Sequence, residues 1–227
     1  HDGDGNIWVI RGSMHYDDDP RLQADWLVRS FDPDGKFVKG FGYKDFPRNA
    51  RMRGIAVERK TGHVYIANTY ANQIHKFTLD GVPVWTVGTK GAGPSQLSSP
   101  GGMDIDRRNG ELYVIDAGNH RVKVLSPEDG SVLRTWGEKG TGDGQFKLHE
   151  FSSLAVDEKG YVFVVDTLNN RIQVFDTAGK FITKFGEKGF GGTGRYTSPN
   201  CVEVRKGKLY VADSSGHEIE IYKINYP

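Results

Sequence analysis

Two stretches of the sequence, DAGNHRVKV at residues 116–124 and DTLNNRIQV at residues 166–174, share one pattern. Each begins with Asp, continues with Asn and Arg at matching positions, and then alternates apolar and polar residues. Such alternation is typical of a β-strand whose two faces differ in burial. The recurrence therefore indicates one local structure that the chain builds more than once.

The pattern extends into a repeat of about 50 residues, in the range of known repeat architectures. A second apolar strand precedes each acidic position, as in GIAVERKTGHVY at residues 54–65, and two further strands follow it. The first repeat lacks its opening strand and the fifth lacks its closing strand. The equivalent anchor residues of the later four repeats are Asn68, Asp116, Asp166 and Asp213.

Four short strands per repeat predict the blades of a β-propeller, an all-β fold in which sheets stack around a central axis. Glycine is abundant, with 30 of 227 residues, which suits a chain with many turns. We expect one propeller domain over residues 1–227. Its approximate blades are residues 1–46, 47–93, 94–143, 144–193 and 194–227, of which the first and last are incomplete.

Charge and composition exclude several classes. The net charge of +1 gives no basic surplus, which disfavours binding to nucleic acid. No apolar run is long enough to span a membrane, and the single Cys201 cannot form an internal disulfide. Because the chain opens with HDGDGN and lacks an initial Met, we expect a processed, extracytoplasmic protein, periplasmic or secreted. The chain is also expected to be part of something longer.

The units GIAV…VYIAN and SLAV…NRIQVF, linked by WGEKGTGDGQF at residues 136–146, resemble NHL repeats over nearly the whole chain. The resemblance implies a propeller that is most often six-bladed. With five repeats visible, either about one blade is missing or five blades close alone. We expect the six-bladed type with a truncated N-terminus.

The repeated Asp–Asn–Arg pattern is interpreted as a structural turn brace. The acid ends the second strand and Arg begins the third, so carboxylate and guanidinium are expected to pair across one hairpin with two parallel hydrogen bonds. The Asn in the turn is expected to cap backbone N–H groups. The brace residues are Asp116, Asn119 and Arg121 in one repeat, and Asp166, Asn169 and Arg171 in the next.

Candidate functional residues should lie where the repeats differ. The first repeat carries an insertion, RGSMHYDDDPRLQAD, in place of the turn. A histidine beside three carboxylates could ligate a divalent cation such as calcium or zinc, although a solvated loop is the simpler interpretation. The candidate metal or rim loop is His15, Asp17, Asp18 and Asp19.

A second candidate site lies at the central channel. In the amidating-lyase propellers that this sequence distantly resembles, metal-binding histidines enter several innermost strands, but Arg53 and Asn200 stand at such positions here. Further along the same innermost strands, two repeats carry Asp104 and Glu203 at the position where two others carry Ala56 and Ala155. Two carboxylates meeting in the channel would have raised pKa values or recruit a cation, unless each pairs with a neighbouring base. The candidate channel site is Arg53, Asp104, Asn200 and Glu203.

These observations favour a non-catalytic scaffold whose rim and face loops bind a protein, peptide or glycan partner. One alternative is a metal-dependent lyase or hydrolase with its site at the channel. The other is a reader of single-stranded RNA, which would use the basic stretch between the first two blades. That stretch contains Lys44, Arg48, Arg51, Arg53, Arg59 and Lys60.

Overall fold

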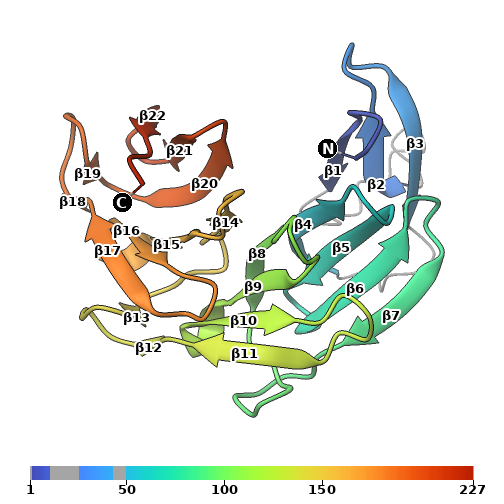
Figure 1. Cartoon of the computed structure of the whole chain (residues 1–227). Helices are drawn as coiled ribbons and strands as arrows, with labels where there is room; N and C mark the ends of the chain where they lie inside the picture. The colour runs from blue at the N-terminus through green and yellow to red at the C-terminus, as the bar shows by residue number, and fades with distance from the viewer. Residues whose placement is uncertain (1, 11–25, 43–49, 227) are drawn as a thin grey trace, which may run out of the picture.

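Each sequence repeat forms one twisted antiparallel sheet in the computed structural model, which describes residues 2–10, 26–42 and 50–226. The five sheets seen in this part of the chain are arranged in an arc around a central axis, so the prediction of an all-β propeller is confirmed (Figure 1). We call the sheets blades 1 to 5 and the strand positions A to D, from the axis outward. None of the helices in the described ranges is long and apolar enough to cross a membrane.

The innermost strands of blades 2 to 5 contact one another in chain order around the axis. Blade 1 has three described strands, at positions B to D, and blade 5 has three at positions A to C. The strands of blades 1 to 3 are β1 (Ile7–Ile10), β2 (Trp26–Phe31), β3 (Phe37–Gly42); β4 (Met52–Glu58), β5 (His63–Asn68), β6 (Gln73–Thr78), β7 (Pro83–Val87); β8 (Pro100–Ile105), β9 (Leu112–Asp116), β10 (Arg121–Leu125) and β11 (Val132–Trp136). Those of blades 4 and 5 are β14 (Leu154–Val156), β15 (Val162–Asp166), β16 (Arg171–Phe175), β17 (Phe181–Phe185); β20 (Pro199–Arg205), β21 (Lys208–Asp213) and β22 (Glu218–Lys223).

The loops that join successive blades contain short parallel strand pairs that the sequence analysis did not predict. Strand β12 (Glu138–Lys139) pairs with β13 (Gln145–Phe146), and β18 (Glu187–Lys188) pairs with β19 (Arg195–Tyr196). A glycine-rich sequence with two-residue strands carries too little alternation to be recognised as β structure. These pairs lie in the D–A loops that lead into blades 4 and 5.

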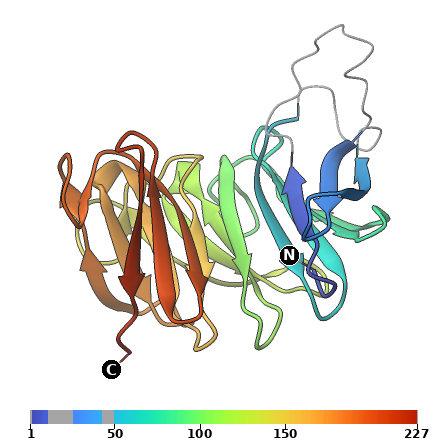
Figure 2. The same ribbon diagram turned by 90° about the horizontal axis from the view of Figure 1, so that it is seen from above.

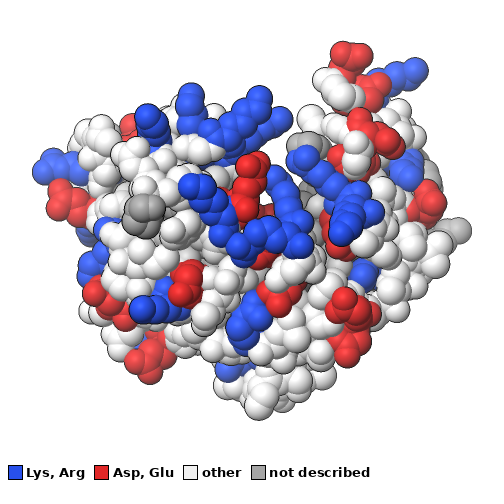
Figure 3. Space-filling view, viewed as in Figure 1, with Lys and Arg blue, Asp and Glu red and all other residues white. Residues whose placement is uncertain are grey.

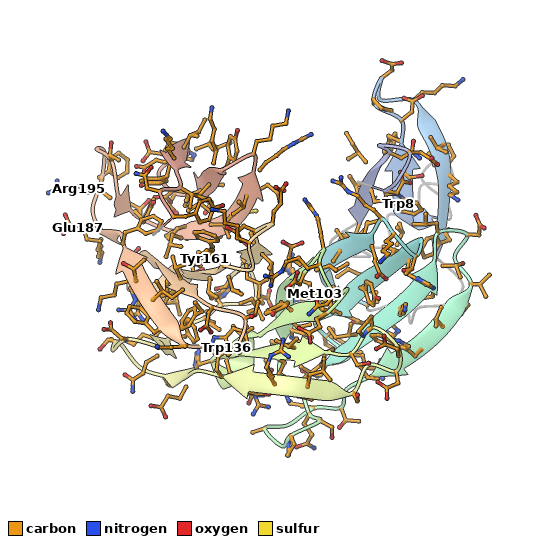
Figure 4. The ribbon with its side chains drawn as sticks, in the orientation of Figure 1. Trp8, Met103, Trp136, Tyr161, Glu187 and Arg195 are labelled. Atoms are coloured by element: carbon orange, nitrogen blue, oxygen red, sulfur yellow. The ribbon has the colours of Figure 1, made fainter. Side chains whose placement is uncertain are left out.

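The hydrophobic core lies between the blades. Four clusters of buried side chains fill the four interfaces between neighbouring blades. Met103 belongs to the cluster between blades 2 and 3, and Trp136 packs against the cluster between blades 3 and 4 (Figure 4). The sheets of blades 2 to 4 therefore bury both faces, as expected for stacked repeats.

Close to the axis the innermost strands approach each other so tightly that side chains would not fit between them. A Cβ atom added to Gly54 would lie 2.3 Å from the carbonyl oxygen of Gly101. One added to Gly102 would lie 2.6 Å from the Cα atom of Ser153. Small residues at the start of β4 and β8 are thus required by backbone packing.

The two ends of the arc expose faces that are buried elsewhere in the same molecule. Ile219 in blade 5 is 68% exposed, whereas the equivalent Ile74, Val122 and Ile172 of blades 2 to 4 are fully buried. Val9 in blade 1 is 40% exposed, although its equivalents in the other four blades are also fully buried. Blades 1 and 5 lie at opposite ends of an open arc (Figures 1 and 2), so five blades do not close into a ring.

Candidate functional site

The Asp–Asn–Arg brace was predicted to pair carboxylate and guanidinium across one hairpin by two parallel bonds. In blade 3 the Arg121 Nε donates to the Asp116 Oδ2 at 2.7 Å, and in blade 4 Arg171 Nε lies 2.7 Å from Asp166 Oδ2. Both carboxylates are completely buried. Only this one nitrogen of each Arg reaches the carboxylate, so the expectation of a two-bond pair is wrong.

The remaining guanidinium N–H groups bind the D–A loop that precedes each blade. In blade 4, Arg171 donates to the backbone carbonyls of Thr141, Gly142 and Gln145 at 2.8–3.0 Å. Arg121 makes the equivalent contacts in blade 3. Each Arg therefore fastens its hairpin to the loop from the previous blade. Sequence reasoning missed this because the loop carbonyls have no side-chain signature.

The Asn residues also act differently from the prediction. Asn119 Nδ2 donates to the Asp116 carboxylate and to the carbonyl of Gly91, instead of accepting from backbone N–H groups. The residue with positive φ in each turn is the one that follows, His120 or Asn170, at φ 53° and 54°. These residues close the short 3₁₀ turns η2 (Ala117–Asn119) and η3 (Thr167–Asn169).

Arg53 lies at the start of β4, on the face of the propeller that carries the B–C turns. Its Nη2 lies 3.1 Å from the Glu150 Oε1, and its guanidinium carbon lies 4.2 Å from the centre of the Phe151 ring. The ring of His149 stacks on Phe151 with the centroids 5.1 Å apart. The Arg53 Nε is buried and has no hydrogen-bond partner among the described residues.

Asp104 lies in β8 and joins two blades. Its Oδ1 accepts from the backbone N–H of Ile105, and its Oδ2 accepts from the N–H of Val156 in β14, both at 2.8 Å. Burial raises the pKa of Asp104 to about 6, against the lowering effect of these two N–H donors and with a smaller raising effect from Glu203. The carboxylate therefore satisfies a backbone donor of the next blade.

The other two channel candidates do not complete a catalytic group. Glu203 is exposed in β20, and it acts on Asp104 through its charge rather than through a described hydrogen bond. Asn200 lies near the start of the same strand and is half-buried. Arg53 is engaged with Glu150 and Phe151, and within the described residues it forms no hydrogen bond or ion pair with Asp104 or Glu203. In residues 2–10, 26–42 and 50–226, no three His, Cys, Asp or Glu side chains are placed to hold a metal ion.

The remaining sequence candidates are not brought into one site. His15, Asp17, Asp18 and Asp19 lie outside the described residues, as do Lys44 and Arg48 of the basic stretch. The rest of that stretch is divided by β4, since Arg51 and Arg53 lie before or at its beginning and Arg59 and Lys60 follow its end. A strand of this length spans the propeller, so the stretch does not form one continuous basic surface.

A group of exposed apolar side chains on the B–C face was missed by sequence reasoning. Tyr70 is 60% exposed in the B–C turn of blade 2, and Leu168 is 55% exposed in that of blade 4. Phe151, 47% exposed, is joined to the Leu168 turn through a 2.7 Å hydrogen bond between the hydroxyls of Ser152 and Thr167. The sequence signal that could have identified this group was the presence of large apolar residues in turns and loops, which are usually polar.

Comparison with known proteins identifies the repeat. Residues 97–125 match the sequence model of the NHL repeat, and residues 143–226 match a family described as a 6-bladed beta-propeller. The chain is an NHL-repeat β-propeller. Relatives include NHL repeat-containing protein 3 of Mus musculus, 32% identical over 66% of this chain and 45% of that protein. Peptidyl-glycine alpha-amidating monooxygenase of Mus musculus is 30% identical over 58% of this chain and 14% of that protein. The chain thus spans less than half the length of these relatives.

Solved structures share the fold of this NHL propeller. A catalytically inactive H270A variant of virginiamycin B lyase from Staphylococcus aureus aligns with a TM-score of 0.60 and 16% identity, over 98% of this chain and 68% of that one. A chain from the crystal structure of a nidogen/laminin complex aligns with a TM-score of 0.65 and 16% identity, over 87% and 67%. At this identity the likeness concerns the fold alone.

Proposed function

We propose that this NHL propeller is a non-catalytic binding module that docks a protein or peptide partner on the face carrying the B–C turns. The observation that carries the proposal is the exposed group of Tyr70, Phe151 and Leu168, with Arg53 and His149 packed against Phe151. Aromatic and arginine side chains are enriched among the residues that contribute most to protein interfaces. We call these five residues the docking group.

Three members of the docking group, Phe151, Arg53 and His149, contact one another before any partner binds. Phe151 contacts both the Arg53 guanidinium and the His149 ring, and Glu150 pairs with the same guanidinium. A preorganised aromatic surface loses little side-chain entropy on binding.

The engagement of the channel residues supports a non-catalytic role. Asp104 uses both carboxylate oxygens on backbone N–H groups, and Arg53 is committed to Glu150 and Phe151. General acid–base chemistry would need a carboxylate that can reach a bound substrate. The nidogen/laminin structure, one chain of which shares this fold, is a complex.

The test is selection of a random peptide library displayed on phage against the immobilised chain. We expect the enriched peptides, remade synthetically, to lose roughly tenfold or more in affinity for Phe151→Ser and Tyr70→Ser, as expected for interface anchors. Phe190→Ser is the matched control, because Phe190 is 76% exposed but lies in the β18–β19 loop on the outer rim. Peptides that bind Phe151→Ser and Tyr70→Ser as tightly as the unchanged chain would contradict the proposed docking face.

A further inference from the structure

Basic side chains gather around the channel on the face opposite the docking group (Figure 3). They come from the A–B turns of the described blades. In blades 2 to 5 strand A is antiparallel to strand B, and the turn that joins them emerges on this face. The turns of blades 2, 3 and 5 each carry two adjacent exposed cations. These are Arg59 and Lys60, Arg107 and Arg108, and Arg205 and Lys206.

A cavity of about 460 Å³ opens on this face between blades 2 and 3. Its cationic lining consists of Arg59, Lys60, Lys76, Arg107 and Arg108. Val57 and Ile105 form part of its apolar wall. This volume is in the range of small-molecule sites and is too small for a folded partner. Glu58 and Glu128 are the acidic residues of the lining.

The acidic side chains near the cavity form hydrogen bonds with residues of their own blades. Glu58 is buried and accepts from the hydroxyls of Tyr65 and Thr61. Asp106, beneath the cavity, binds Arg108 through two hydrogen bonds of 2.6 and 2.9 Å to its guanidinium. Glu128 accepts from the Ser126 hydroxyl at 2.7 Å.

The cations of the neighbouring turns act on one another. Burial lowers the pKa of the Arg59 guanidinium, and the positive charges of Arg107 and Arg205 lower it further, against the opposing effects of Glu203 and Asp2. Arg107 and Lys60 form no hydrogen bond or ion pair with any residue that the structure describes. Positive charge is therefore concentrated here without a matching number of anions, an arrangement that attracts a negatively charged ligand.

We propose that this cavity binds a ligand that carries a chain of phosphate groups, with Arg59 and Arg107 as its principal contacts and Lys60 beside them. Planar guanidinium groups present parallel N–H donors that match the oxygens of a phosphate. Several cations from separate turns suit a ligand with more than one phosphate. The site lies on the face opposite the docking group and does not depend on the proposed function.

The test is isothermal titration calorimetry of the chain with inorganic tripolyphosphate at roughly 50 mM NaCl, where charge interactions are weakly screened. We expect Arg107→Ala to weaken binding by roughly tenfold, the effect of losing charge-assisted hydrogen bonds. Arg195→Ala is the matched control, because Arg195 is exposed, pairs with Glu187 and lies at the outer edge of the molecule (Figure 4). Phe151→Ser should leave tripolyphosphate binding unchanged, which separates this site from peptide docking.

Parallel titrations identify the source of the phosphate chain. Binding of adenosine diphosphate as tightly as tripolyphosphate would show that the site accepts a nucleotide, and tighter binding of tripolyphosphate would favour a free polyphosphate. Thermal unfolding of Arg107→Ala verifies that the variant is folded. The proposal is overturned if tripolyphosphate does not bind, if Arg107→Ala and Arg195→Ala weaken it equally, or if a single-stranded oligonucleotide binds more tightly and does so independently of Arg107.

Discussion

At the scale of single residues, Asp104 shows how one carboxylate can look catalytic in sequence and be structural in the fold. It occupies a position where blades 2 and 4 have alanine, Ala56 and Ala155. Its oxygens accept from the N–H groups of Ile105 and Val156, the second of which belongs to the next blade. The two donors stabilise the charged form, but burial has the larger effect, so the pKa of Asp104 is raised to about 6.

The raised pKa of Asp104 predicts a pH dependence of stability. Between the ordinary value of 3.8 and about 6, the folded state binds more protons at this group than the unfolded state. The free energy of unfolding contributed by Asp104 therefore falls as the pH rises through this window. We expect urea denaturation of Asp104→Asn to lack this contribution, so that its stability relative to the unchanged chain increases as the pH rises from about 4 to about 6. A constant difference between the two chains over this range would show that Asp104 does not titrate there.

At the scale of structural elements, the brace connects the B–C hairpin of a blade to the loop arriving from the previous blade. In blade 4, Asp166 accepts from Arg171, Asn169, Gln173 and the backbone N–H of Lys147. Arg171 then donates to the carbonyls of the D–A loop. The buried carboxylate thus organises donors from both elements. In blade 5, Asp213 has a similar role without an Arg partner. It accepts from the backbone N–H groups of Thr197, Ser198 and Gly216 and from the Thr197 hydroxyl.

Removing the centre of the brace should be costly. Asp166→Ala leaves buried donors and the Arg171 guanidinium without their acceptor, so we expect the free energy of unfolding to fall by about 3–5 kcal/mol. Asp143→Ala provides the control, because the Asp143–Lys184 pair is about half exposed on both sides and lies in the same loop region. Its loss should cost at most about 1 kcal/mol. Urea denaturation measures both, and equal effects would show that the brace is not a principal source of stability.

At the scale of the whole molecule, the exposed fractions of side chains at equivalent positions in different blades can be compared directly. Ile172 and Ile219 occupy equivalent positions in blades 4 and 5, yet one is fully buried and the other is 68% exposed. Ile221, beside Ile219, is 59% exposed. The difference arises because blade 4 is followed by another blade, whereas the same face of blade 5 lies at the end of the arc (Figure 1).

The same substitution at the two equivalent positions should change the free energy of unfolding by very different amounts. Ile172→Lys places an unpaired charge in an interface between blades, and we expect a loss of more than about 4 kcal/mol or failure to fold. Ile219→Lys should change the free energy of unfolding by less than about 0.5 kcal/mol. Thermal or urea unfolding of both variants measures the contrast. A large loss in Ile219→Lys would mean that this face is covered in the folded chain.

Sequence periodicity was sufficient to predict the propeller because the same pattern of four short strands recurs at intervals of about 50 residues. Units of this size bury their sheet faces by stacking on one another. The Asp–Asn–Arg spacing likewise indicated a structural turn. Its hydrogen bonds could not be predicted, because the acceptors of the Arg side chains are backbone carbonyls of a loop distant in sequence. The candidate channel site was predicted only as a set of polar residues near the axis.

What the sequence determined by itself was the number of visible repeats, the strand order within each blade and the approximate position of the turns between the described strands, since these depend on local pattern. Tertiary structure alone decided which polar groups remain available to a ligand. Asp104 accepts from Val156 of the next blade, and Arg53 of blade 2 pairs with Glu150 in the loop that leads into blade 4. Arg59, Arg107 and Arg205 act on one another because three turns, far apart in the chain, emerge around one axis. Charge and hydrogen bonding depend on distance in space, which the linear pattern does not contain.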